Sequence, residues 1–188
     1  MRGVEDRNIL DKFCEQFCKI VEKHTKYIIV SGFVAISSGR TRATEDIDMI
    51  IKELDITSFT KLHKELVKEG FVCVQSDSAE TTFEYLKEKS PVRYTWKNEP
   101  LPEMEIKFAK DLLDEYQIKN KVKLPLTGLD IWFSSINVNI AFKEELLKSD
   151  KDMKDAEHLR KVYPELVNEG EIEKVKELIK RFRLWVKK

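Results

Sequence analysis

Two aspartates separated by one residue are the side chains best suited to chemistry. Asp46 and Asp48 lie in the segment D-I-D-M-I-I, whose alternation predicts a β-strand. Because strand side chains alternate, both carboxylates point to one face, while Ile47 and Met49 point to the other face, toward a core. Neighbouring carboxylates repel each other unless a positive charge joins them, and paired oxygen ligands suit Mg²⁺ or Mn²⁺. The spacing therefore predicts a divalent metal ion that holds a phosphate group.

A glycine turn and two arginines precede this acidic pair. Residues 27–30 predict a short buried strand, and Ser31-Gly32 predicts a turn that opens a brief helical segment, where backbone N–H groups can bind an anion. Arg40 and Arg42, in a polar loop, add positive side chains. A second interpretation stays open: the two aspartates form the solvated face of an edge strand, and the arginines are their salt-bridge partners.

The residues S-G-F-V-A-I followed by R-T-R-A-T-E-D-I-D resemble the signature of the nucleotidyltransferase superfamily of DNA polymerase beta. They look most like its minimal abortive-infection and toxin-type members, which typically read Gly-Gly-Thr-Ala-Leu and then Arg-x-Ser/Thr-x-Asp-Ile-Asp. Here the hydroxyl of Ser31 comes before the glycine of the turn, where Gly-Gly or Gly-Ser is usual. The resemblance implies that the acidic pair binds Mg²⁺ or Mn²⁺. It also implies a nucleotide-binding set: Ser31, Gly32, Arg42, Thr44 and Lys143.

A third carboxylate is expected from a neighbouring strand. Residues 103–109 alternate like a strand, with Glu105 and Lys107 on one face. Members of the superfamily often supply a third acid from such a strand, so the resemblance implies Glu105 as a catalytic residue and metal ligand. The alternative is an exposed Glu105 that pairs with Lys107 or another neighbour. Asp130, in the predicted hairpin 122–133, is the next candidate.

Lys143 places a cation on an otherwise apolar helical stripe. Such a lysine either extends its ammonium group to solvent or points into a site. The following K-D-M-K-D-A resembles a Lys-Asp-x-x-Asp-Ala segment of the toxin-type enzymes. The resemblance implies that Lys143 grips phosphates and that Asp152 orients Lys143 or the acceptor. Alternatively, Asp152 and Asp155 simply favour the dipole at a helix start.

Length and hydrophobic periodicity predict an α/β chain with a small mixed twisted sheet flanked by helices, and the resemblance implies that this is the nucleotidyltransferase fold. At 188 residues we expect a catalytic core over 1–133 and a helical C-terminal subdomain over 134–188. Further strands are expected at 71–74 and 92–96. Helices are expected at 4–24, 57–70, 111–120, 135–148, 150–163 and 171–186, and 78–89 is a helix or a loop.

Composition limits the classes of molecule and the cell compartment that we expect for this protein. Lys and Arg together number 34, as do Asp and Glu, so no global positive field exists for broad nonspecific nucleic-acid binding. The three cysteines show no metal-site spacing, and we expect them to be reduced. No apolar run approaches the roughly 18 residues of a membrane span, and the charged start is unlike a secretion signal. We expect a soluble, cytoplasmic protein without a membrane partner.

The activity that the resemblance implies is a metal-dependent transfer of a nucleoside monophosphate from an NTP to an acceptor, which is RNA such as tRNA, a protein or a small molecule. The alternative is a module of the same fold that has lost catalysis and acts in binding, as in a toxin-antitoxin pair.

Overall fold

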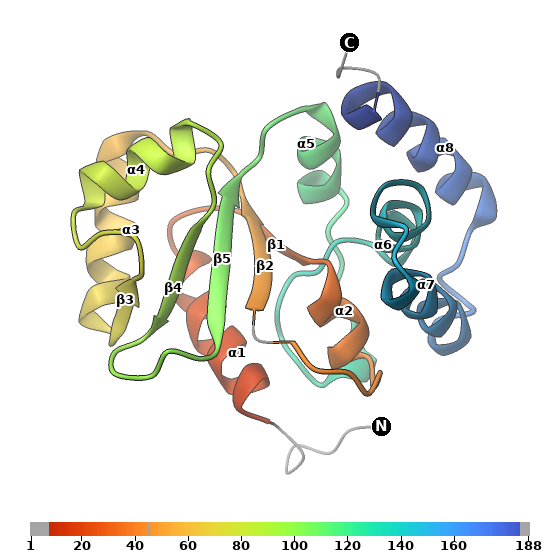
Figure 1. The fold of residues 1–188 in the computed structure, drawn as a ribbon, viewed down its shortest axis with the longest axis horizontal. Coiled ribbons are helices and arrows are strands. Elements are labelled where there is room, and N and C mark those ends of the chain that lie inside the picture. The colour runs from red at the N-terminus through yellow and green to blue at the C-terminus, as the bar shows by residue number, and fades with distance from the viewer. Residues whose placement is uncertain (1–7, 45, 185–188) are drawn as a thin grey trace.

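The computed structural model describes residues 8–44 and 46–184. A five-stranded sheet forms its centre, with helices on both sides (Figure 1). The spatial order of the strands is β1-β2-β5-β4-β3. Only β2 and β5 pair in parallel, and the other neighbours are antiparallel. The strands are β1 (Tyr27–Val30), β2 (Asp46–Ile51), β3 (Phe71–Cys73), β4 (Val92–Trp96) and β5 (Glu103–Phe108).

The period of two along β2 separates the core from the site. Ile47, Met49 and Ile51 are fully buried on one face, and Asp46 lies exposed on the other. In the register of the parallel pair, Asp48 stands opposite Glu105. The alternation expected from the sequence therefore holds in the folded chain.

Three helices cover the apolar face of the sheet: α1 (Ile9–Val21), α3 (Ile56–Lys68) and α4 (Ala79–Lys87). Asn8 and Asp11 form a reciprocal capping box at the start of α1, which satisfies two backbone N–H groups there. Phe13 and Phe17 of α1 pack edge-on against Phe71 of β3. Full burial of each such ring stabilises the fold by about 1.5–3 kcal/mol.

The opposite face carries the acidic pair and a smaller apolar cluster. Ile28 and Ile50 pack there against Ile118 of α5 (Leu112–Lys119). The short helix α2 (Gly32–Ser37) follows β1 directly. Because α5 covers only one end of β2, the end that bears Asp46 and Asp48 stays accessible.

The last third of the described chain is helical, and its helix α7 packs against α2 (Figure 1). It consists of α6 (Ile136–Phe142), a π-helical turn at Lys143–Leu147, α7 (Asp150–Val162), α8 (Glu169–Ile179) and a second π-helical turn at Lys180–Leu184. π-helical turns are rare and often occur at functional sites. Within the described residues, no helix is long and apolar enough to cross a membrane.

The fold is the mixed α/β sheet with flanking helices that the sequence predicts, and 78–89 forms a helix. The hairpin prediction at 122–133 is wrong. A 3₁₀ turn occupies Pro125–Thr127, and Phe133 makes only isolated bridges, to Val122 and to Ile29. Gly128, in the left-handed region, ends that turn where the prediction placed the hairpin loop. The predicted ends at residues 4 and 186 lie outside the described residues.

Candidate functional site

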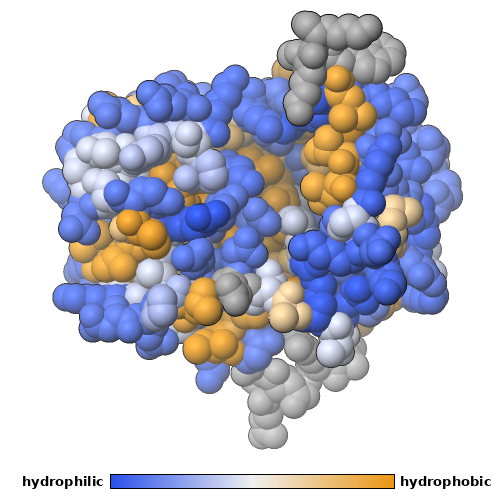
Figure 2. All heavy atoms as spheres, in the orientation of Figure 1, coloured by the Kyte–Doolittle hydropathy of each residue, from blue (hydrophilic) through white to orange (hydrophobic). Residues whose placement is uncertain are grey.

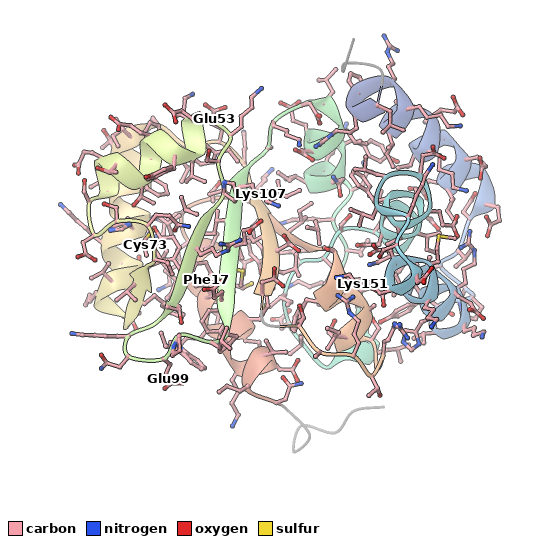
Figure 3. All side chains as sticks on the ribbon, in the orientation of Figure 1. Phe17, Glu53, Cys73, Glu99, Lys107 and Lys151 are labelled. Atoms are coloured by element: carbon pink, nitrogen blue, oxygen red, sulfur yellow. The ribbon has the colours of Figure 1, made fainter. Side chains whose placement is uncertain are left out.

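Asp46 and Asp48 line one polar pocket of about 450 Å³ at the end of β2. Ser31, Gly32, Arg42, Thr44 and Asp152 also line this pocket, together with four residues that sequence reasoning had not assigned to it: Ala43, Arg93, Glu103 and Lys151. Figure 3 shows Lys151 on the helical side and Lys107 on the sheet. The pocket therefore gathers most of the predicted site residues from separate segments. Glu105 and Lys143 lie just outside its lining.

Each aspartate of the pair has its own partner. The hydroxyl of Thr44 donates a hydrogen bond of 2.9 Å to Asp46 Oδ1. The ammonium nitrogen of Lys107 lies 3.4 Å from Asp48 Oδ1. Carboxylate oxygens that open into one pocket are the ligands that Mg²⁺ and Mn²⁺ prefer, so this donor set fits a divalent cation.

Glu105 lies beside Asp48 and forms ion pairs with two cationic side chains. Its carboxylate is 2.9 Å from Arg93 Nη2 and 2.8 Å from Lys107 Nζ. No three His, Cys, Asp or Glu side chains of the described residues come together closely enough to bind one metal ion. Glu105 is thus placed on the adjacent strand, as the register requires, while its role as a third ligand stays a prediction.

The surroundings of Asp48 disfavour its ionised form. Burial raises the pKa of Asp48 above its ordinary value. The charge of Lys107 opposes this rise, and the negative charges of Glu105 and Asp46 add to it. A cation bound at this carboxylate would relieve the same electrostatic cost.

The turn before α2 is strained. Ser31 has φ 65° and ψ −133°, a conformation that glycine adopts readily and other residues rarely do. Gly32 has a different constraint, because a Cβ atom there would lie 1.9 Å from the guanidinium group of Arg42. Only glycine at position 32 allows Arg42 to lie against the backbone at the pocket wall.

Asp155, to which the sequence analysis gave no role in the site, is a buried carboxylate that contacts three cationic side chains. Asp155 of α7 is fully buried; its carboxylate lies 2.9 Å from Lys143 Nζ and 3.5 Å from Arg42 Nη1, and it accepts a hydrogen bond from Arg40. Lys143 itself is 1% exposed, so it does not extend to solvent. The sequence did hold one signal for this role of Asp155. In K-D-M-K-D-A, Asp155 follows Asp152 by three residues, so both carboxylates lie on one helix face.

Asp152 has a smaller part in this cluster. One carboxylate oxygen lies 3.6 Å from Lys143 Nζ, and the other accepts a hydrogen bond from the N-cap residue Ser149. The backbone N–H of Asp152 donates to the Ser149 hydroxyl in return. Ser149 therefore caps α7, and Asp152 holds the Ser149 hydroxyl while it also faces the polar pocket. Asp130 is remote from the site, because its highly exposed side chain pairs with Lys123.

No model of a known protein family and no curated protein matches this chain. Solved structures do resemble it over nearly its whole length. An antigenic nucleotidyltransferase-like protein from Paracoccidioides brasiliensis is 17% identical with a TM-score of 0.54, over 94% of this chain and 89% of that chain. The antibiotic-resistance factor ANT(2'')-Ia is 13% identical with a TM-score of 0.53, over 94% of both chains. At these identities the likeness shows the fold, which is that of the nucleotidyltransferases.

Proposed function

We propose that this protein is a metal-dependent nucleotidyltransferase that transfers a nucleoside monophosphate from an NTP to an acceptor hydroxyl group. The observation that carries this proposal is the opening of Asp46 and Asp48 into one polar pocket beside Arg42 and the Ser31-Gly32 turn. In the reaction, the acceptor oxygen bonds to the α-phosphorus, the bond from that phosphorus to the bridging oxygen breaks, and pyrophosphate leaves. The acceptor hydroxyl loses its proton.

The acidic pair would hold the divalent cation. Mg²⁺ or Mn²⁺ bound by Asp46 and Asp48 would neutralise the triphosphate and orient its reacting phosphorus. Thr44 keeps the Asp46 carboxylate in place through its hydrogen bond. Glu105, opposite Asp48, is a carboxylate on the same sheet face that could take the acceptor proton.

The cations around Asp155 would bind the phosphates. Arg40, Arg42 and Lys143 carry three positive charges against the two negative charges of Asp152 and Asp155. One positive charge is left over in a largely buried cluster, which favours an anion nearby. Arg42 is the member that lines the polar pocket, so it would contact the phosphates first.

One observation favours an alternative function, a noncatalytic binding module of the same fold. Lys107 Nζ lies 2.8 Å from Glu105 Oε1 and 3.4 Å from Asp48 Oδ1, so an ammonium group sits beside carboxylates that would otherwise serve a metal ion. A module of this kind would bind a nucleotide without turning it over.

The deciding experiment combines binding and turnover. Wild-type protein is titrated with Mn²⁺ and a nonhydrolysable NTP, and pyrophosphate release is measured with each of the four NTPs. We expect binding and release in the wild type, and loss of both in Asp46→Asn and Asp48→Asn. Binding without release from any NTP would favour the alternative, and absence of binding would contradict both functions.

A further inference from the structure

A second cleft adjoins the polar pocket and has a volume of about 320 Å³. Ser31 and Asp48 line both spaces, so the two spaces meet at these residues. Its walls come from the sheet strands β1, β2 and β5, from α5 and α6, and from the two π-helical turns. The end of α4 and the residues just after it, Lys89 and Ser90, complete the lining. We call this space the apolar cleft. A molecule bound in it would lie next to Asp48.

The interior of the apolar cleft is largely hydrophobic. Its apolar lining includes Ile50, Phe108, Phe142, Leu146 and Leu147. Figure 2 shows apolar surface in the furrow between the sheet and the C-terminal helices, flanked by hydrophilic residues. A concave, mostly apolar space of this size is typical of a small-molecule site.

The charged groups around this lining are mainly positive. Its basic residues are Lys89, Lys107, Lys110, Lys143 and Arg183, and its acidic residues are Asp48 and Asp114. Three of these five cations pair with carboxylates outside the lining: Lys107 with Glu105, Lys143 with Asp155 and Arg183 with Asp111. Lys89 and Lys110 form no ion pair within residues 8–44 and 46–184. The cleft therefore offers an apolar floor and two lysines without acidic partners.

An ion pair joins two walls of the cleft. Arg183, in the C-terminal turn, lies 2.7 Å from Asp114 Oδ1 and 2.9 Å from Asp111 Oδ2 at the start of α5. The side-chain amide of Gln117, which is also in α5, donates a hydrogen bond to the same Asp114 oxygen. This connection limits the width of the cleft, so it suits a small molecule better than a polymer such as RNA.

We propose that the apolar cleft binds the acceptor, and that the acceptor is a small anionic molecule with an apolar body and a hydroxyl group. The acceptor role rests on the proposed function, whereas the binding of an apolar anion does not. The body would lie on the hydrophobic floor, its negative charge would lie near Lys89 and Lys110, and its hydroxyl would reach toward Asp48. Like charges would repel a polycationic acceptor from the same space.

The place proposed for the NTP, the polar pocket, supports the assignment of the acceptor to the apolar cleft. The polar pocket already supplies cationic and metal-binding side chains for a triphosphate, including Arg42 and Lys151. A neutral nucleobase in the apolar cleft would fill its floor but would leave Lys89 and Lys110 without a counter-charge. An apolar anion uses both features of the cleft.

Binding can be tested without any catalysis. The probe is 8-anilinonaphthalene-1-sulfonate, an aromatic anion that fluoresces in apolar sites, titrated into the full chain without NTP or metal. We expect a saturable site whose affinity falls about tenfold or more in the double variant Lys89→Glu/Lys110→Glu. The matched control, Lys64→Glu/Lys174→Glu, has the same net charge and should bind the probe like the wild type. Equal affinities in all three proteins would overturn the proposal.

A second experiment assigns the occupant. A nonhydrolysable ATP analogue with Mn²⁺ should leave the probe bound, whereas 3-phenyllactate, an apolar hydroxy acid, should displace it. Displacement by the ATP analogue would place the nucleoside in the cleft and overturn the acceptor assignment. Phenyllactate should also increase pyrophosphate release more than its methyl ester, kanamycin or an RNA oligonucleotide does. Stimulation by RNA or kanamycin alone would overturn the proposed class of acceptor. If no NTP is turned over, the displacement result still tests the cleft.

Discussion

The ammonium group of Lys143 and the carboxylate of Asp155 lie 2.9 Å apart, and neither side chain has meaningful access to water. Lys143 begins a π-helical turn, and Asp155 lies on the next helix, so this ion pair links the two segments. Asp155 also contacts Arg40 and Arg42, which come from the loop before β2. Through one carboxylate, the helical part of the chain is tied to the loop that precedes the acidic pair.

Replacement of Asp155 should be among the most damaging single changes near the site. Asp155→Asn would leave buried positive charges without their main counter-charge, which costs about 3–5 kcal/mol. Lys143→Met should destabilise the protein less, because Asp155 keeps its contacts with both arginines and the methionine side chain fills the same space. Urea unfolding of both variants measures the difference. Equal destabilisation would show that the arginines contribute little to the cluster. Because Lys143 is buried, Lys143→Ala should also destabilise the fold.

Ser31→Gly should stabilise the protein. The positive φ of Ser31 strains a residue that has a Cβ atom by about 1–3 kcal/mol. Glycine removes that strain, although it makes the unfolded chain more flexible by an amount worth about 0.4–1 kcal/mol. The expected net gain is about 1 kcal/mol in thermal or urea unfolding. Ser31→Ala is the control and should show no gain, since alanine keeps the Cβ atom.

The stability of the metal-free protein should depend on Asp48 and pH. Its pKa is raised in the folded state, mainly by burial, so folding favours the protonated carboxyl. That contribution is fully present below the unfolded pKa of about 3.9 and is lost as pH rises through the higher folded pKa. Asp48→Asn should therefore gain stability relative to wild type between about pH 4 and pH 8. Parallel stability curves for the two proteins over this range would contradict the assignment.

Lys107 should compete with a divalent cation for Asp48. The Lys107 side chain is 44% exposed and can move away, but its positive charge must leave before a cation binds. Lys107→Met should therefore bind Mn²⁺ more tightly than wild type does, by a factor of several, in isothermal titration without nucleotide. Lys64→Met serves as the control for loss of one surface charge. Weaker Mn²⁺ binding in Lys107→Met would mean that Lys107 supports the metal site.

Features set by neighbouring residues could be predicted from the sequence. The alternation in β2 places Asp46 and Asp48 on one face because backbone geometry gives every strand a period of two. The helices covering the sheet follow from apolar residues at helical spacing, and the Ser31-Gly32 turn follows from its residue types. Gly128 misled the hairpin prediction, because a glycine with positive φ can end a 3₁₀ turn as well as form a hairpin loop.

Contacts between distant segments were decided only by the tertiary structure. Asp155 meets Arg40 across 115 residues of sequence, and no local spacing encodes that pair. The sequence around Lys143 shows the same apolar stripe whether its ammonium group reaches solvent or a buried carboxylate. The direction of the Lys143 side chain therefore depends on the packing of α7 against the π-helical turn. Lys107 and Glu105 lie beside Asp48 because β5 pairs in parallel with β2 in that register. A local pattern fixes which face a side chain takes, whereas its partner is selected by the packing energy of the whole fold.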